Sequence, residues 1–287
     1  MRLLSPQLQA FLAIVKYKTV HAAAIALHLT QTAVTQRLRT LEIKLSTSLF
    51  VRTRRGMLLT IEGEALLRYC NEVQELEGEA LSFITGTGIE KNVSICMTGP
   101  TTIMHSRIIP QCTPIMNQYP RLLIRFDIND NDNGINALRQ GMSQLAIIER
   151  GSFSNEMEYK DLKPEHYILV ASSKWKKRRL LDIIKNERII DFEPNDQMTF
   201  NYLKHYDFFE NANKERHYVN RTDTLALMIT NELGYGVLPF EFAKPYLASK
   251  QLITLNTGKT YPHLLLLAWF PRHQQPNYFS ALIEACT

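Results

Sequence analysis

Three amphipathic helices are predicted at the start of the chain, where apolar residues recur three or four positions apart. Ser5 and Pro6 suit the N-cap and the first position of the first helix. Thr19 begins a second helix that ends near His28, and Thr30 suits the cap of a third. The repeating apolar positions are Leu8, Phe11, Leu12, Val15, Val20, Ala23, Ala24, Leu27, Val34, Leu38 and Leu41. The third helix keeps its other side polar, which leaves that side free to meet a partner.

A short hairpin and a long helix are predicted next. Residues 49–52 and 56–59 can pair as strands around a charged turn at 53–56. Thr60 suits the N-cap of a helix that runs to a hinge at residues 85–88. Its apolar residues are spaced alternately three and four apart, at Leu66, Tyr69, Val73, Leu76, Ala80 and Phe83. Such a heptad seam predicts dimerisation through a coiled coil, and packing on the chain's own body is the alternative.

The last two hundred residues show an α/β pattern, in which short apolar strands alternate with helical stretches. The predicted strands are 93–97, 122–128, 145–148, 167–171, 188–191 and 263–270. The chain is expected to leave a first lobe and return to it. The predicted domains are residues 1–60, the helix and hinge 61–88, a first lobe of 89–161 and 262–287, and a second lobe of 162–261.

Charge is distributed unevenly along the 287 residues, whose formal net charge is +5. The first sixty residues hold nine lysines and arginines against one acid, Glu42, and the remainder is slightly acidic. A basic block on a different background is typical of a module that binds a polyanion, and a solvated basic face is the alternative. The polar side of the third helix can reach base edges from the major groove: Gln36 suits adenine, and Arg37 or Arg39 suits guanine or phosphate.

Composition excludes several classes of protein. The longest apolar stretch, 264–270, is too short to span a membrane, so we expect a soluble cytoplasmic protein with no membrane partner. Cys70, Cys96, Cys112 and Cys286 have no metal-ligand spacing and are expected to be reduced core thiols. The eight histidines are dispersed, and no metal is expected.

The first sixty residues carry a family resemblance. The run Ala22-Ala23, Leu27, residues 30–38, Leu41-Glu42, residues 49–52, Leu59-Thr60 and Gly63 resembles the signature of LysR-type transcriptional regulators. Two positions depart from it, since Ser46 replaces the usual glycine and Thr32 the usual proline or serine. The resemblance implies a winged helix-turn-helix that binds double-stranded operator DNA. The residues expected to contact DNA are Gln31, Thr32, Thr35, Gln36, Arg37, Arg39, Arg52, Arg54 and Arg55; an ordinary surface role is the alternative for each.

The same resemblance implies an architecture for the rest of the chain. The linker helix would form homodimers that commonly assemble as tetramers, and RNA polymerase is a further candidate partner. The two C-terminal lobes would form an effector domain like that of periplasmic binding proteins, although Gln144 replaces the family's usual aspartate. A small metabolite would bind between the lobes, with no other cofactor expected. A general likeness to regulators that respond to basic amino acids favours an amino acid.

Residues at the strand ends are the candidates for holding that effector. Residues 98–102 follow the first predicted strand and open a helix, so their hydroxyls and N–H groups can hold a carboxylate, or simply cap the helix. Asp130 can pair an ammonium. Glu149 can face the cleft or pair with its neighbour Arg150, which is the simpler expectation. The candidate effector-binding set is Thr98, Thr101, Thr102, Asn129, Asp130, Glu149 and Thr222.

An enzyme fused to a DNA-binding domain and a DNA-binding protein without an effector are the alternatives to a regulator. An enzyme fused to a DNA-binding domain would need a catalytic motif, and the sequence has no nucleophile elbow, zinc-protease helix or dinucleotide fingerprint. Residues 258–260 resemble the end of a phosphate loop but lack its first glycine, so a turn is expected there. A DNA-binding protein without an effector remains the third alternative.

Overall fold

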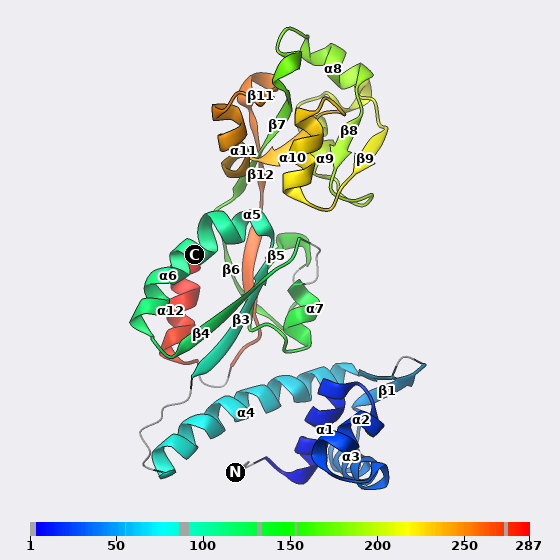
Figure 1. Ribbon diagram of the computed structural model, residues 1–287, viewed down its shortest axis with the longest axis vertical. Coiled ribbons are helices and arrows are strands. Elements are labelled where there is room, and N and C mark those ends of the chain that lie inside the picture. Colours follow the sequence, from blue (N-terminus) through cyan, green and yellow to red (C-terminus); the bar gives the residue numbers. More distant parts are fainter. Residues whose placement is uncertain (1–3, 55, 86–91, 131–133, 153, 273–274) are drawn as a thin grey trace. The chain divides into compact units, whose positions relative to one another are not determined.

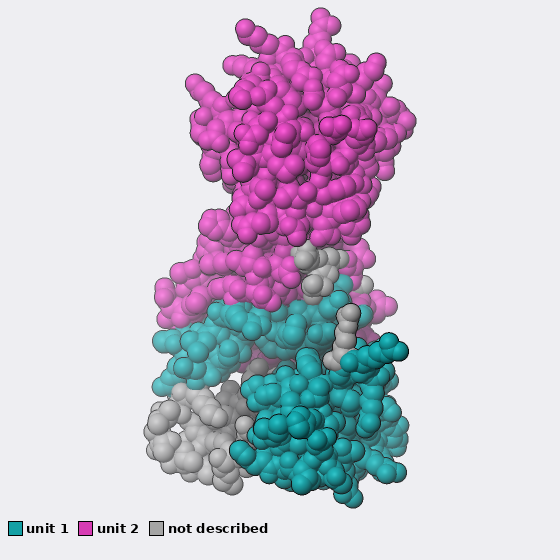
Figure 2. Space-filling view, turned by 45° about the vertical axis from the view of Figure 1, so that its right-hand side comes forward, with its two compact units in different colours: residues 1–97, 119–125, 135–144 teal, residues 98–118, 126–134, 145–287 magenta. Residues whose placement is uncertain are grey.

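The computed structural model describes residues 4–54, 56–85, 92–130, 134–152, 154–272 and 275–287, with only the backbone described for 74–85. The chain divides into two compact units, residues 1–97, 119–125 and 135–144, and residues 98–118, 126–134 and 145–287 (Figure 2). No helix in the described ranges is long and apolar enough to cross a membrane.

The N-terminal part of the first unit contains three helices and a hairpin, followed by one long helix (Figure 1). The hydroxyls of Ser5, Thr19 and Thr30 accept hydrogen bonds from backbone N–H groups three residues later, at 3.3, 3.1 and 3.1 Å. The predicted N-caps Ser5 and Thr30 are therefore confirmed, and Thr19 caps the helix that was predicted to start near it. The elements are α1 (Pro6–Tyr17), α2 (Val20–Leu27), α3 (Gln31–Leu45), β1 (Phe50–Thr53), β2 (Gly56–Leu59) and α4 (Ile61–Thr85).

These elements share one apolar core. Phe11, Ile14 and Val34 are fully buried in it, whereas Leu12 and Val15 are only partly buried. The buried stripe of α1 is therefore rotated towards Ile14 relative to the prediction. From α4, Leu67 and Cys70 are buried in the same core, so the start of this helix packs on the chain's own body.

Two sheets organise the rest of the chain. A five-stranded sheet has the order β4-β3-β5-β13-β6, with β13 antiparallel to both β5 and β6. In the second sheet β7 is central and pairs antiparallel with β10, β11 and β12. The strands are β3 (Val93–Gly99), β4 (Leu122–Ile128), β5 (Leu145–Glu149), β6 (Glu158–Asp161), β7 (Glu165–Ser172), β10 (Gly236–Pro239), β11 (Leu252–Thr254), β12 (Thr260–His263) and β13 (Leu265–Trp269).

The predicted strand 263–270 is wrong as a single element. It divides at Leu264, because β12 ends at His263 in the second sheet and β13 begins at Leu265 in the first. The outward passage lies between β6, which ends at Asp161, and β7, which begins at Glu165. The return passage at Leu264 could not be recognised from the sequence, because it lies at the start of a continuous apolar run. Leu264 is the one exposed residue of that run.

Helices cover both sheets, and a parallel pair of strands lies beside the second, β8 (Ile189–Asp191) and β9 (Arg216–Tyr218). In the first lobe α6 and α12 lie side by side (Figure 1), where the Cys112 and Cys286 sulfurs are 3.6 Å apart. All four cysteines are buried and free, as predicted. The helices are α5 (Thr101–Ile103), continued by a π-helical turn (Met104–Ile108), α6 (Ile109–Gln118), α7 (Gly134–Arg139), α8 (Leu180–Asn186), α9 (Met198–His205), α10 (Thr222–Thr230), α11 (Phe240–Ala248) and α12 (Asn277–Cys286).

Candidate functional site

The outward side of α3 is polar and accessible. Gln31, Thr32, Gln36 and Arg39 are exposed there, and Thr35 is half-buried. Val34 is fully buried on the opposite side of the helix. The Gln31 amide nitrogen lies 2.9 Å from His21 Nδ1, so this side chain is partly held by α2. The other side chains of this surface, Thr32, Thr35, Gln36 and Arg39, present hydrogen-bonding groups of the type that read base edges.

Basic side chains extend this surface onto the hairpin. Arg37 is half-buried on α3, and Arg52 and Arg54 are exposed on and beside β1. Arg55, also predicted to contact DNA, lies outside the described residues. In the part of the chain that the structure describes, Arg37, Arg39, Arg52 and Arg54 form no ion pair, so their charges are available to phosphate.

The hairpin is held against the helices by hydrogen bonds from its backbone N–H groups and from the loop before it. The Glu42 carboxylate accepts from the Leu49 N–H at 2.8 Å, which fixes the loop between α3 and β1. The Met57 N–H donates to the Lys18 carbonyl at 2.8 Å. Gly56 has φ +122°, and a Cβ there would lie 2.6 Å from that same carbonyl, so no larger residue fits.

Thr60 and Gly63 fix the start of α4. The Thr60 hydroxyl donates to the Ser48 carbonyl at 2.8 Å and accepts from the Gly63 N–H at 3.0 Å. A Cβ on Gly63 would lie 2.2 Å from the Leu49 carbonyl oxygen. The motif residues of this region therefore act by joining the hairpin to the long helix.

The predicted dimerisation seam is only partly described. Leu66 packs partly against the N-terminal core, Val73 is half-buried, and Tyr69 is 56% exposed. Leu76, Ala80 and Phe83 lie where side chains are not described, and the hinge lies outside the described residues from position 86 onward.

A cavity of about 620 Å³ lies within the second unit, between strand ends of the two sheets. Glu149 and Arg150, at the end of β5, line it from the first lobe. The turn at residues 191–198 and the start of α10 line it from the second. Its volume is within the range of sites for small ligands.

Four of the seven predicted effector-binding residues line this cavity: Thr102, Asp130, Glu149 and Thr222. The other three have structural contacts instead. Thr98 is buried and its hydroxyl donates to the Asp127 carbonyl at 2.9 Å, while the Asn129 N–H donates to the Gly99 carbonyl at 3.0 Å. The N–H and hydroxyl of Thr101 donate to the Asp130 carboxylate at 2.6 and 2.8 Å. The start of α5 was expected to hold the carboxylate of a ligand. It binds the carboxylate of Asp130 instead.

The expected pairing of Glu149 with its neighbour Arg150 is wrong. Glu149 lies 3.2 Å from His263 Nε2, and Arg150 lies 3.4 Å from Asp161. Glu149 is the last residue of β5 and Arg150 begins a 3-10 helical turn, so the two side chains belong to different elements and meet partners on different segments, β12 and β6. The hydrogen bond from His263 lowers the pKa of Glu149 more than its partial burial raises it.

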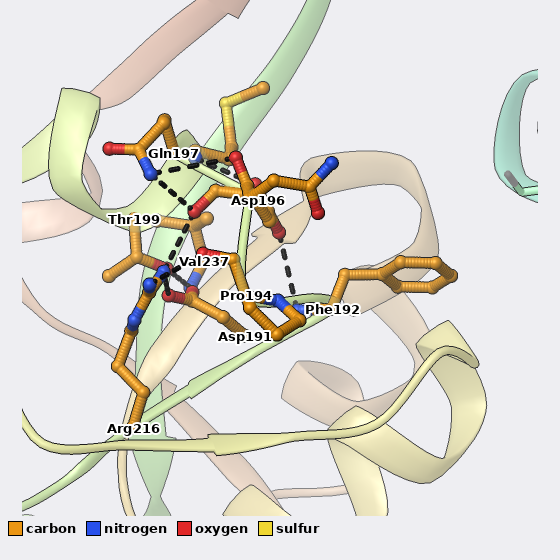
Figure 3. Close-up of polar contacts among 10 residues, drawn as sticks. Asp191, Phe192, Pro194, Asp196, Gln197, Thr199, Arg216 and Val237 are labelled. Atoms are coloured by element: carbon orange, nitrogen blue, oxygen red, sulfur yellow. Dashed lines mark hydrogen bonds and ion pairs between the residues drawn. The ribbon is translucent and has the colours of Figure 1, made fainter. Parts of the chain in front are cut away.

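The turn after β8 is held by one arginine (Figure 3). Arg216 donates to the Asp191 carboxylate at 3.1 Å and to the carbonyls of Asp196 and Pro194 at 2.8 and 2.7 Å. The Asp196 carboxylate accepts from the N–H groups of Phe192 and Met198, which closes the turn and begins α9. The Arg216 side chain is 11% exposed and the Asp191 side chain 2%, so this is a buried ion pair.

Burial raises the pKa of Asp191 to about 6, although hydrogen bonds from Thr199 and Arg216 oppose that change. The negative charge of Asp196 raises it further. Desolvation of a buried carboxyl therefore outweighs its paired cation.

Sequence reasoning missed the contribution of this turn to the cavity. Asp191, Glu193, Asp196 and His263 all line the cavity, and none was a candidate. The one available signal was that Asp191 ends a predicted strand. The other residues lie far apart in the sequence from Glu149 and Asp130, and only the fold brings them together.

Comparisons with known proteins agree with this architecture. Residues 6–64 match the family model for the bacterial regulatory helix-turn-helix protein, lysR family, and residues 90–287 match the LysR substrate binding domain. A carbapenem-hydrolyzing beta-lactamase transcriptional activator from Serratia marcescens is 30% identical over 64% of this chain and 61% of its own length. A protein of the same description from Enterobacter cloacae is matched over 56% of its length, so the chain spans less than two thirds of both relatives.

Other relatives align over more of the chain. The regulator LysG of Mycobacterium tuberculosis is 25% identical over 86% of this chain and 82% of its own length. The structure of ArgP from Mycobacterium tuberculosis has a TM-score of 0.80 at 22% identity, over 99% of this chain and 96% of that one. LysG from Corynebacterium glutamicum with bound effector Arg has a TM-score of 0.74 at 18% identity, with the same coverage. These two structures share the fold, and the two family models together match most of the chain, which therefore belongs to the LysR family of bacterial regulatory helix-turn-helix proteins.

Proposed function

We propose that this chain is a transcriptional regulator that binds operator DNA through α3 and the β1–β2 hairpin, and responds to a small molecule held in the cavity. The observation that carries the proposal is the outward side of α3. Its glutamine, threonine and arginine side chains are accessible, and its arginines have no acidic partner in the described ranges. A helix of this kind suits insertion into a major groove.

The surface divides into residues for reading bases and residues for positioning. Gln36, exposed near the start of α3, suits a bidentate contact with adenine, and Thr35 adds a hydroxyl beside it. Arg52 and Arg54 suit phosphates or the minor groove beside the hairpin. Arg37 is half-buried near the core and suits the DNA backbone.

The proposal includes self-association through α4. Tyr69 is a large side chain that remains 56% exposed on this helix, as expected of a residue that a second copy covers. Tyr69→Lys is expected to shift the protein towards monomer in light scattering at a fixed concentration. Leu181→Lys, at an exposed apolar position of α8, is the control and should leave the mass unchanged.

The C-terminal cavity is proposed to bind a ligand without converting it. It contains no group of metal-ligating side chains in the described residues, and its acids are mostly engaged in structural hydrogen bonds and ion pairs. Binding between two lobes can change their separation, and so the spacing at which paired recognition helices meet DNA.

The experiment is DNA binding to the intergenic region beside the protein's own gene, across a salt series. The wild type is compared with the triple variant Thr35→Ala, Gln36→Ala, Arg52→Ala. Gln251→Ala with Lys185→Ala, both exposed in the C-terminal domain, is the control. Specific, salt-sensitive binding should be lost in the triple variant alone. Equal binding by all three proteins would contradict the proposed surface.

A further inference from the structure

The cavity is strongly acidic. One guanidinium, of Arg150, and one imidazole, of His263, also line it. The carboxylates that line it are five: Asp130, Glu149, Asp191, Glu193 and Asp196. Tyr167 lines the same cavity, and burial raises its pKa. The negative charges of Glu165, Asp196 and Glu149 raise this pKa further, so the field of several carboxylates reaches the Tyr167 hydroxyl.

The arginines in and around the cavity are already paired, and the imidazole of His263 is already hydrogen-bonded. Arg150 faces Asp161 at 3.4 Å, and His263 faces Glu149 at 3.2 Å. Arg216, behind the cavity wall, is held by Asp191 and by two carbonyls. A ligand carboxylate would therefore have to displace an existing ion pair to gain a cationic partner.

Glu193 and Asp196 differ from the other acids of the cavity. Within the described ranges neither forms an ion pair. Asp196 is held by two backbone N–H groups, whereas the Glu193 carboxylate has no hydrogen bond in the described structure. The turn that carries both residues thus presents uncompensated negative charge to the cavity.

Carboxylates of the chain also lie at the helix starts around the cavity. The first N–H of α5 donates to Asp130, and that of α9 donates to Asp196. At the start of α10 the Thr224 N–H donates to Asp223, which is itself paired with Arg221. Free N–H groups at a helix start are the usual alternative to a cation for holding a carboxylate, and at each of these starts one such group is already bound to an aspartate of the chain.

An independent observation concerns His263. A carboxylate only accepts hydrogen bonds, so the contact with ionised Glu149 places the ring proton on Nε2. In the neutral ring Nδ1 is then an acceptor, and this atom is buried without a hydrogen-bond partner in the described structure. A buried acceptor without a partner is costly, so a ligand whose N–H reached this atom on binding would be favoured.

From these observations we propose that the cavity binds a cationic amine or guanidine that carries no carboxylate, such as a diamine or a decarboxylated basic amino acid. This inference rests on the proposed function, in which the cavity is the effector site. The acids of the 191–198 turn balance the ligand's charge, and the aromatic rings of Tyr167, Tyr261 and Phe192, which also line the cavity, suit an ammonium or guanidinium.

The test uses three pairs of compounds that differ only by a carboxylate: agmatine and arginine, putrescine and ornithine, cadaverine and lysine. Binding to the full-length protein is measured by calorimetry and thermal shift at constant ionic strength. In at least one pair the amine should bind about tenfold or more tightly than the amino acid and raise the melting temperature. Equal or tighter binding of the amino acid in all pairs, or no binding of any amine at 10 mM, would overturn the proposal.

Two variants separate the cavity from general attraction of cations to an acidic protein. Glu193→Gln removes a charge that holds nothing in the fold, and it should weaken amine binding about five- to tenfold. Glu210→Gln, at an exposed acid of the same lobe, is the matched control and should leave binding unchanged. Equal effects of the two variants would count against the cavity as the site. Operator binding is assayed in parallel, so that loss of the amine response with intact DNA binding rejects the ligand class and not the regulator.

Discussion

The α3 surface and the cavity carry opposite charge, and the fold uses that charge differently in the two places. On α3 and the hairpin, Arg39, Arg52 and Arg54 are exposed and form no ion pair in the described ranges. In the cavity, Asp130 and Asp196 accept backbone N–H groups, and Asp191 is paired with Arg216. The charged side chains of the α3 surface are therefore available to a partner. Most of the charged side chains of the cavity are already engaged in hydrogen bonds or ion pairs within the chain.

This difference indicates how function and stability should separate. Removing a side chain from the α3 surface removes contacts with DNA and leaves the core intact. Removing Asp130, Asp191 or Asp196 from the cavity also removes a hydrogen bond that shapes a turn or begins a helix. Substitutions in the two regions should therefore have distinguishable effects on binding and on the free energy of unfolding.

The largest expected effect is that of Arg216→Met on stability. The substitution leaves Asp191 buried without its cation and releases the carbonyls of Pro194 and Asp196. Breaking a buried ion pair in this way costs about 3–5 kcal/mol. The free energy of unfolding is measured by denaturant titration with a probe in the C-terminal domain. Arg188→Met, which breaks the exposed pair with Glu215, is the control and should cost less than about 1 kcal/mol; similar losses in both variants would contradict the role of burial.

The α3 surface should behave in the opposite way. Gln36→Ala is expected to weaken operator binding by about 1–3 kcal/mol, the usual value of a bidentate base contact, with the melting temperature unchanged. Arg52→Ala should weaken binding to all sequences alike and reduce the salt slope by about one. Val34→Ala, on the buried side of the same helix, provides the contrast, since it should lower the melting temperature. A fall in melting temperature with Gln36→Ala would show that the two faces of α3 are not independent.

Asp191 makes a smaller contribution that depends on pH. Its pKa is raised by burial to about 6 in the folded protein, against 3.8 for the free side chain. Between those values the folded state binds the proton more strongly, so the contribution to stability is present at low pH and is lost as pH rises towards 6. Relative to Asp191→Asn, the wild type should lose roughly 1 kcal/mol between about pH 5 and pH 7. Parallel curves for the two proteins in unfolding experiments across that range would contradict the shifted pKa.

The same contrast explains what the sequence alone could predict. The N-caps at Ser5 and Thr30 depend on contacts three residues away, and both were predicted correctly. The division of the chain at Leu264 was not, because neighbouring apolar residues give no sign that they pair in different sheets. Local hydrogen bonds are visible in a sequence, and the choice of strand partner is not.

The candidate sites follow the same rule. The α3 residues share one helix, so the apolar pattern that buries Val34 also leaves Gln36 exposed. The cavity combines strand ends and turns that are more than a hundred residues apart, such as Glu149 and His263, 114 positions apart. Asp130 lines the cavity as expected. It also accepts the N–H of Thr101, which was expected to bind a ligand carboxylate.

The smallest expected effect concerns Ser46, where the sequence departs from the family pattern. This residue ends α3 with φ 52° and ψ 34°, a left-handed conformation that is strained for a residue with a side chain. Glycine adopts it without strain, although a more disordered unfolded chain offsets part of the gain. Ser46→Gly should therefore raise the free energy of unfolding by about 0.5–1 kcal/mol. Ser280→Gly, within the right-handed helix α12, should lower it by a similar amount, because there glycine brings only its entropic cost. A loss of stability in both variants would mean that the end of α3 tolerates serine without strain, and that the departure from glycine at this position is neutral for the fold.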